Sequence, residues 1–179
     1  MSNISVGFIG AGRVTKILLT GWKRANAMPR RVVLFDPNRE ACATLRLLST
    51  VVEDSTEPAK AACQDVVFLA VHPTAMSEAA VACKDALRSE AILVSLAPKF
   101  TIAKIGEMLG GFNRIVRAIP NAPSVVGCGY NPIAFGGQLA PDDKSKVIGM
   151  LSSLGECPEV EERYLEAYSI ISAMGPTYF

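Results

Sequence analysis

The segment VGFIGAGRVT, residues 6–15, decides the fold that this sequence predicts. An apolar run over residues 4–9 has the composition of a buried strand and leads directly into Gly10-Ala11-Gly12. A stretch with helical periodicity follows from Arg13 to Ala25. Glycines between a strand and a helix allow a tight turn and bring the backbone close to a phosphate, which the free N–H groups of the helix attract. This order indicates a dinucleotide-binding unit, and an ordinary structural turn is the alternative.

The turn and the first helical residues form the predicted phosphate cradle, which consists of Gly10, Ala11, Gly12, Arg13 and Val14. Thr15 stands where the usual glycine pattern has a third small residue, so we expect a slightly larger separation between helix and strand. The guanidinium of Arg13 could reach a phosphate oxygen or a ribose, or it could lie in solvent.

Outward from this segment, strand-like and helix-like stretches alternate along the chain. Strands are predicted at 31–35, 51–52, 65–71, 91–96, 114–118, 132–135 and 157–160, and helices at 38–48, 58–63, 74–87, 102–109, 141–154 and from 162. The loop after Pro120 is rich in glycine, proline and asparagine, which predicts turns instead of regular structure. The pattern predicts an α/β protein of the Rossmann type, doubly wound, with a mostly parallel sheet and helices on both faces.

The composition is that of an ordinary globular protein and excludes several classes of function. The chain has 179 residues, 50% of them hydrophobic and 20% charged, with a formal net charge of +1. This balance argues against a nucleic-acid or membrane partner. The five cysteines are isolated from one another, which predicts no metal site and mostly reduced core thiols. The chain shows no leader sequence and no apolar run long enough for a bilayer, so we expect a cytoplasmic protein.

A carboxylate follows the second strand at the distance expected of a ribose ligand. Asp36 lies at the end of the strand 31–35, about 20 residues beyond the glycines, where it could accept hydrogen bonds from the adenosine ribose hydroxyls. This position favours NAD over NADP, because a carboxylate repels a 2′-phosphate, although Arg39 is close enough in sequence to offset that repulsion. A cap or turn residue before Pro37 is the alternative for Asp36.

His72 is the only histidine, and it ends the predicted buried strand at 65–71. Ligands bind at this edge of open α/β sheets, so His72 could be catalytic, could line the cofactor site or could cap the strand. We favour the cofactor wall, because the sequence identifies no carboxylate that would orient the imidazole.

Four segments together resemble the pyrroline-5-carboxylate reductase family. They are residues 6–12 (VGFIGAG), 69–73 (LAVHP), 117–123 (RAIPNAP) and 175–179 (GPTYF). The resemblance covers essentially the whole chain, and the R-x-x-P-N-x-P segment is its most specific part. It implies an NAD(P)H-dependent oxidoreductase that reduces a cyclic imine, 1-pyrroline-5-carboxylate, to L-proline.

The resemblance also implies roles for individual residues. Ala70, Val71, His72 and Pro73 would flank the nicotinamide ribose, and Asn121 would lie near the nicotinamide and the substrate. The substrate side would further include Ala122, Met174, Gly175 and Thr177. No catalytic acid is assigned, because a protonated imine is already a good hydride acceptor and orientation can supply the rest.

Two departures from the family concern the substrate more than the cofactor. His72 stands where the family usually has lysine, and Met174 stands in the small-residue loop 172–176 that holds the substrate carboxylate, where it removes a hydroxyl donor. A related dehydrogenase of another small acid and a non-catalytic dinucleotide-binding domain therefore stay open as alternatives.

Members of the family continue beyond this point into a helical domain that dimerises and completes the substrate pocket. We therefore expect residues 1–160 to form the NAD(P)-binding domain and 161–179 to begin the substrate and dimerisation region, in a fragment or in a protein that has lost that domain. A helix over 162–171 would carry Tyr164, Leu165, Tyr168 and Ile171 on one side. We expect this side to pack on the core or on a partner chain, which makes a homo-oligomer possible.

Overall fold

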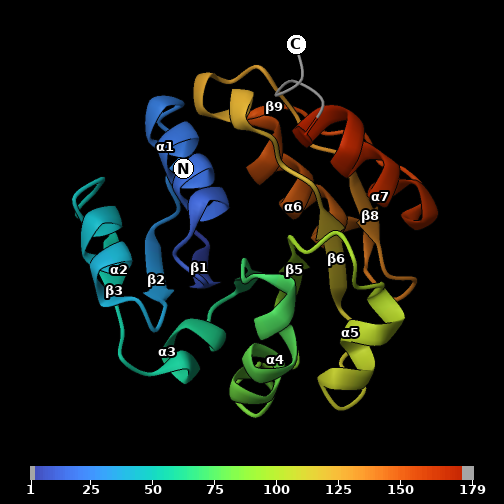
Figure 1. Ribbon diagram of the computed structural model, residues 1–179, viewed down its shortest axis with the longest axis horizontal. Coiled ribbons are helices and arrows are strands. Elements are labelled where there is room, and N and C mark those ends of the chain that lie inside the picture. The colour runs from blue at the N-terminus through green and yellow to red at the C-terminus, as the bar shows by residue number, and fades with distance from the viewer. Residues whose placement is uncertain (1–2, 175–179) are drawn as a thin grey trace.

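The computed structural model describes residues 3–174 and contains one mixed sheet of seven strands in the order β3-β2-β1-β4-β5-β6-β8 (Figure 1). All neighbouring strands are parallel except the last pair, in which β8 runs antiparallel to β6. The strands are β1 (Ser5–Ile9), β2 (Arg31–Phe35), β3 (Val52–Asp54), β4 (Val66–Leu69), β5 (Ile92–Ser95), β6 (Ile115–Ala118) and β8 (Ile133–Phe135). The predicted Rossmann-type α/β fold is confirmed.

Helices cover both faces of this sheet. In Figure 1, one layer contains α1 (Arg13–Arg24), α2 (Arg39–Arg46) and α6 (Pro141–Ser152), and the other contains α3 (Pro58–Ala62), α4 (Met76–Lys84) and α5 (Ile102–Met108). Successive residues of a strand point to opposite faces, so a strand buried on both faces must be apolar throughout. The fully buried β4 therefore divides its side chains, with Val66 and Phe68 in one core and Val67 and Leu69 in the other.

An aromatic cluster fixes α1 on the first of these cores. The rings of Phe8 and Phe68 stack on neighbouring strands with centroids 4.8 Å apart, and Trp22 of α1 meets Phe68 edge-on at 5.9 Å. The indole N–H of Trp22 donates to the carbonyl of Met150 in α6 at 2.8 Å. This bond satisfies the one polar atom of a buried indole and locks α1 against α6, so the helix start beside the glycine turn has a fixed position.

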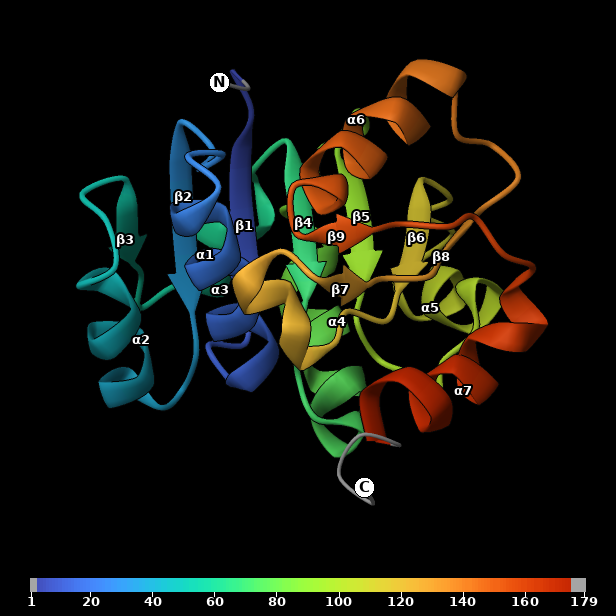
Figure 2. The ribbon, with the colours of Figure 1, turned by 90° about the horizontal axis from the view of Figure 1, so that it is seen from above.

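The segment after β6 is more regular than predicted. A 3₁₀ helix, η2 (Ala122–Val126), ends at Gly127, whose φ of 78° permits the left-handed turn that follows. The short strand β7 (Gly129–Tyr130) then pairs in parallel with β9 (Gly155–Glu156), on the same side of the sheet as α1 and α6 (Figure 2). The expectation of turns alone after Pro120 was therefore wrong.

The strand predicted at 157–160 was also misplaced. The observed β9 lies at Gly155–Glu156, and only Glu159 of the predicted segment makes a β-bridge, to Ile133. Apolar residues such as Cys157 and Val160 suggested the later position, but strand formation depends on the available partner. That partner is β7, whose Gly129 lies so close to Gly155 that a Cβ on Gly155 would be 2.1 Å from the Gly129 carbonyl oxygen.

The C-terminal helical segment consists of η3 (Glu162–Tyr164), α7 (Leu165–Tyr168) and the π-helical η4 (Ser169–Met174). Leu165 is completely buried against Ile119 and Ala134, so it packs on the core as predicted, whereas Tyr164 and Ile171, expected on the same side, are exposed. The ring of Tyr168 lies 5.8 Å from that of Tyr130. Large apolar side chains on the remaining surface of the segment are exposed, namely Tyr164, Ile170 and Ile171.

The cysteines differ in their surroundings, and all five are free. Cys42 and Cys83 are buried and Cys157 is half-buried, whereas Cys63 and Cys128 are exposed, so the expectation of mostly core thiols was wrong for this last pair. Between residues 3 and 174, no group of histidine, cysteine and acidic side chains could hold a metal ion. No helix in this range is long and apolar enough to cross a membrane.

Candidate functional site

The glycine turn lies where the carboxyl ends of three neighbouring strands meet. The N–H of Gly10 donates to the carbonyl of Phe35, at the end of β2, at 2.8 Å. A Cβ on Gly10 would be 2.4 Å from the carbonyl oxygen of Ala70, which directly follows β4, and Gly10 has a φ of +107°. Only glycine fits this conformation and this close approach, so Gly10 fixes the turn between the ends of β2 and β4.

Gly12 has the opposite environment. It is the N-cap of α1, and a Cβ at this position would have no atom of the described residues within 4 Å. The exposed Gly12 therefore leaves open space directly before the N-terminus of a 12-residue helix. The first turn of α1 carries no acidic side chain. This end of the helix offers unshielded N–H groups and the positive end of the helix dipole, which is the environment that an anionic group requires.

The residues around the turn are held by side-chain hydrogen bonds. The hydroxyl of the buried Thr15 donates to the carbonyl of Gly10 at 2.7 Å, so threonine is accommodated where the sequence pattern expects a small residue. Arg13 is exposed beside Gly12, and Val14 is half-buried. The predicted cradle residues are therefore together, with Arg13 on the open side of the turn.

Asp36 braces the glycine turn from the end of β2. One carboxylate oxygen accepts a hydrogen bond from the Ala11 N–H at 2.7 Å, and the other accepts from the Asn38 N–H at 2.8 Å. The Asn38 side chain in turn caps α2. The turn role considered for Asp36 is therefore observed, and because each carboxylate oxygen has a second lone pair, the ribose role is compatible with it.

His72 is exposed at the end of β4, two residues beyond Ala70. Its Nδ1 accepts a hydrogen bond from the Thr74 N–H at 3.5 Å and lies 2.9 Å from the Thr74 hydroxyl oxygen. His72 thus caps the 3₁₀ helix η1 (Pro73–Ala75), which was one of its three possible roles. The close Thr74 hydroxyl is compatible with either tautomer of the ring, and in the tautomer with Nδ1 as acceptor the proton is on Nε2.

An apolar cavity of about 270 Å³ adjoins the glycine turn. Its wall combines residues from the ends of β1, β2 and β4 with residues of α3 and α4, and it includes Gly10, Phe35, Pro58, Val71 and Ala79. A mostly apolar slot beside an anion-binding helix start suits a flat aromatic ring that is attached to a phosphate.

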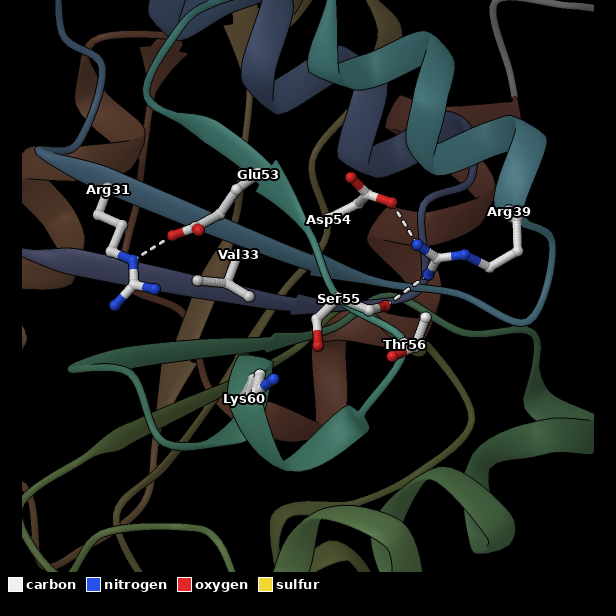
Figure 3. A pocket seen from close by; sticks show the side chains of 8 residues that line it. All are labelled: Arg31, Val33, Arg39, Glu53, Asp54, Ser55, Thr56 and Lys60. Atoms are coloured by element: carbon white, nitrogen blue, oxygen red, sulfur yellow. Dashed lines mark hydrogen bonds and ion pairs between the residues drawn. The ribbon is translucent and has the colours of Figure 1, made fainter.

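A larger, charged cavity of about 460 Å³ lies along β2 and β3, and its eight lining side chains are drawn in Figure 3. Its charges are largely neutralised internally. Arg31 pairs with Glu53, and Arg39 pairs with Asp54 and also donates to the Ser55 carbonyl (Figure 3). Arg39, expected to offset the charge of Asp36, is thus engaged by another carboxylate. We place the candidate site at the glycine turn, where the helix start is unpaired, and not in this larger cavity.

Asn121 does not project a free amide toward the edge of the sheet. It is 7% exposed, its Nδ2 donates to the Ser172 carbonyl at 3.1 Å, and its Oδ1 accepts from the Tyr130 N–H at 3.0 Å. Ala122 is exposed at the start of η2. Of the other predicted substrate residues, Met174 ends the described part of the chain, and Gly175 and Thr177 lie outside the described residues.

One pair of site residues was missed by the sequence-based assignment. Arg117 is the third of the four residues of β6, shortly before Pro120 and Asn121. It is 3% exposed and forms an ion pair with Glu162 at 2.7 Å. The sequence does show a charged residue inside an apolar strand. A buried arginine requires a partner, so this position indicated that an ion pair would form there. The sequence did not indicate which carboxylate that partner would be.

Comparison with known proteins supports a common ancestry over the whole chain. The family described as "NADP oxidoreductase coenzyme F420-dependent" matches residues 5–99, which include the glycine turn, Asp36 and the end of β4. Pyrroline-5-carboxylate reductase of Escherichia coli (strain K12) is 26% identical over 176 residues, which cover 97% of this chain and 65% of that protein. The enzyme of the same name from Mycobacterium leprae is 30% identical over 185 residues, covering 97% of this chain and 60% of the relative.

Solved structures agree with these relatives. Pyrroline carboxylate reductase of Plasmodium falciparum, solved with NADP bound, superposes with a TM-score of 0.87 at 27% identity and covers 99% of this chain and 65% of that one. Pyrroline-5-carboxylate reductase of Coxiella burnetii gives a TM-score of 0.86 at 27% identity, with 99% and 66% coverage. The predicted resemblance is confirmed, and the chain spans less than two thirds of the length of the curated relatives cited above.

Proposed function

The chain belongs to the family described as NADP oxidoreductase, coenzyme F420-dependent, and we propose that it is the NAD(P)H-binding part of a reductase of the pyrroline-5-carboxylate reductase type. The observation that carries this proposal is the helix start at Gly12, which faces open space beside an apolar cavity. The relatives are named for the reduction of pyrroline-5-carboxylate. We therefore propose 1-pyrroline-5-carboxylate as the substrate and L-proline as the product.

The residues of the site fit a dinucleotide. The N-terminus of α1 at Gly12 would hold the diphosphate, the cavity lined by Phe35 and Val71 would take the adenine, and Asp36 would accept hydrogen bonds from the adenosine ribose. Bound NAD(P)H would supply the hydride. The segment Ala70–Pro73 follows β4 at the same edge of the sheet, with Val71 in the wall of the adenine cavity, so it would run along the cofactor from there toward the nicotinamide ribose, where the resemblance places it.

The side chains at this edge would act by orientation and charge placement. A protonated cyclic imine is already electrophilic, so the protein needs to align it and to exclude water. His72 is exposed at this edge, and in the tautomer with the proton on Nε2 it would donate to an oxygen of the cofactor or substrate. Asn121, with both ends of its amide engaged, would act by holding the surrounding backbone in place.

The remaining expectations are part of the same proposal. Residues 1–160 would form the cofactor domain, and the segment from 161 onward would begin the substrate region. Its exposed apolar residues Tyr164, Ile170 and Ile171 would then be covered by a second copy of the protein, and the protein would act in the cytoplasm.

Two measurements on the full chain test the proposal. Titration with NADPH and NADH, followed by cofactor fluorescence, should give saturable binding, and added pyrroline-5-carboxylate should then oxidise the bound cofactor. Binding without turnover, also in a longer natural version of the protein, would favour a non-catalytic dinucleotide-binding domain. Turnover of a hydroxy acid in place of the imine would favour a related dehydrogenase. No binding of either nucleotide would refute the proposal.

A further inference from the structure

An ion pair between a buried arginine and a half-buried glutamate joins three chain segments at the carboxyl edge of the sheet. The Nη1 of Arg117, near the end of β6, lies 2.7 Å from Oε1 of Glu162, the first residue of η3. The Nη2 of Arg117 donates to the carbonyl of Pro98, which follows β5. The same Glu162 oxygen accepts from the N–H of Ile102, at the start of α5, at 2.6 Å. One guanidinium and one carboxylate thus connect β6, the connection from β5 to α5, and the C-terminal helical segment.

The free-energy cost of burying these polar groups is too high for the ion pair to serve stability alone. The Arg117 side chain is 4% exposed and that of Glu162 is 32% exposed. The Nε of Arg117 is buried and has no hydrogen-bond partner among the described residues. Desolvation of a buried ion pair offsets most of its Coulomb attraction, and an unsatisfied N–H adds a further cost. A well-packed apolar pair would serve stability at least as well, so the ion pair is better explained by the geometry that it imposes.

A second polar contact holds the other end of the same helical segment. Asn121 lies just beyond the end of β6. Its Nδ2 donates to the carbonyl of Ser172 at 3.1 Å. Ser172 lies in the last turn of η4, where backbone carbonyls lack helical partners. Between the two contacts, Leu165 fills an apolar seat against Ile119. The end of β6 and the residues that directly follow it therefore contact the segment 162–174 near both of its ends, and Figure 2 shows α7 beside the edge at which the parallel strands end.

We propose that Arg117 and Glu162 are positioning residues that fix the C-terminal helical segment relative to the cofactor edge. The inference rests on the proposed reductase function, because it assigns the ion pair to the substrate side of that site. Glu162 joins the start of the segment to Arg117 of β6, and Ser172, near its end, is held by Asn121, three residues beyond β6. The glycine turn at β1 takes no part in either contact.

The test compares Glu162→Gln with Glu166→Gln in the full chain. Glutamine at 162 retains an oxygen for the Ile102 N–H and removes the charge that Arg117 pairs with. Glu166 lines the same cavity as Arg117 and Glu162, and its carboxylate has no hydrogen-bond or ion-pair partner between residues 3 and 174, so it is the matched control. Arg117→Lys provides a second variant, which keeps the positive charge and loses the two-pronged contact.

For Glu162→Gln we expect a rise of about tenfold or more in KM for pyrroline-5-carboxylate, with the Kd for NADPH within about twofold of the wild type. Arg117→Lys, which keeps a charge opposite Glu162, should raise the KM less than Glu162→Gln does, and Glu166→Gln should match the wild type. In hydrogen exchange, the amides of 163–172 should lose protection in Glu162→Gln while those of α1 keep theirs. Unchanged KM and unchanged protection would overturn the proposal. Equal loss of NADPH binding and of protection throughout the chain would also overturn it, because a general stability role predicts that result.

Failure of the proposed function gives a different pattern. A wild-type chain that neither binds NADPH nor reduces pyrroline-5-carboxylate would refute the function and leave hydrogen exchange to decide the positioning role. Selective loss of protection at 163–172 would then support it, and uniform or absent change would overturn it.

Discussion

The open space at Gly12 makes a prediction that separates cofactor binding from folding. Gly12 has φ −80° and ψ −161°, which alanine adopts without strain, and a Cβ there has no described atom within 4 Å. Alanine is a somewhat poorer N-cap than glycine but restricts the unfolded chain, so the net change in unfolding free energy for Gly12→Ala should stay within about 1 kcal/mol. For a domain of this size the corresponding shift in Tm is about 2–4 °C.

The effect on the cofactor should be much larger, because the new methyl group occupies the space in front of the helix N-terminus. A diphosphate that is pushed away loses one or more charge-assisted hydrogen bonds, worth roughly 1.5–3 kcal/mol each, and part of a dipole interaction of roughly 0.3–1 kcal/mol. A total of about 2–4 kcal/mol corresponds to a roughly 30- to 700-fold rise in the Kd for NADPH.

Gly137→Ala is the matched control, because Gly137 is also exposed, has an ordinary φ and would place its Cβ in open space, far along the chain from the turn. Thermal unfolding and NADPH fluorescence titration are measured on the wild type and both variants. If Gly12→Ala folds normally and binds NADPH within about threefold of Gly137→Ala, the diphosphate does not lie at Gly12 and the reasoning is wrong. A Gly12→Ala protein that is strongly destabilised would contradict the open space itself.

Three further predictions concern other parts of the molecule. Asp36→Asn keeps an oxygen for the Ala11 N–H, loses the bond from the Asn38 N–H and removes the carboxylate charge. The charge disfavours a 2′-phosphate by about 1 kcal/mol, whereas the lost bond affects both cofactors alike, so the ratio of NADH to NADPH affinity should fall about fivefold in paired titrations. An unchanged ratio would exclude Asp36 from cofactor discrimination. Burial raises the pKa of the Cys83 thiol to about 12, so iodoacetamide at mildly alkaline pH should modify Cys63 in the native protein and Cys83 only after unfolding, as mass spectrometry would show; rapid native modification of Cys83 would contradict its burial. Burial of Asp65 opposes ionisation, but hydrogen bonds from Ser5 and Arg88 outweigh it and lower the pKa of Asp65 below its usual value. Its contribution to stability is therefore complete above about pH 5 and is lost as the pH falls through the lowered pKa, so Asp65→Asn should flatten the acid side of a Tm–pH curve, and an identical curve would refute the assignment.

Local sequence determined the parts of the fold that were predicted most accurately. The strand at 31–35 was predicted at its observed bounds, and the helix after the glycine turn begins at Arg13 as expected. In these segments the strand run, the glycines and the helical period are adjacent along the chain, so each supports the others. The sheet edge that holds the candidate site could be located from the sequence for the same reason, because the rules of parallel sheets bring successive strand ends together.

The sequence could not supply the side-chain partners that give this edge its final geometry. Asn121 resembles a ligand-binding residue in its motif, yet its amide joins Tyr130 to Ser172, two groups that only the folded chain brings together. Arg117 raises the same problem, since an arginine in an apolar strand requires a carboxylate without specifying which one. Both residues belong to the R-x-x-P-N-x-P segment, and both bind the C-terminal helical segment. The motif that carries the resemblance to pyrroline-5-carboxylate reductases therefore joins, in the folded chain, the end of the sheet to the C-terminal helical segment.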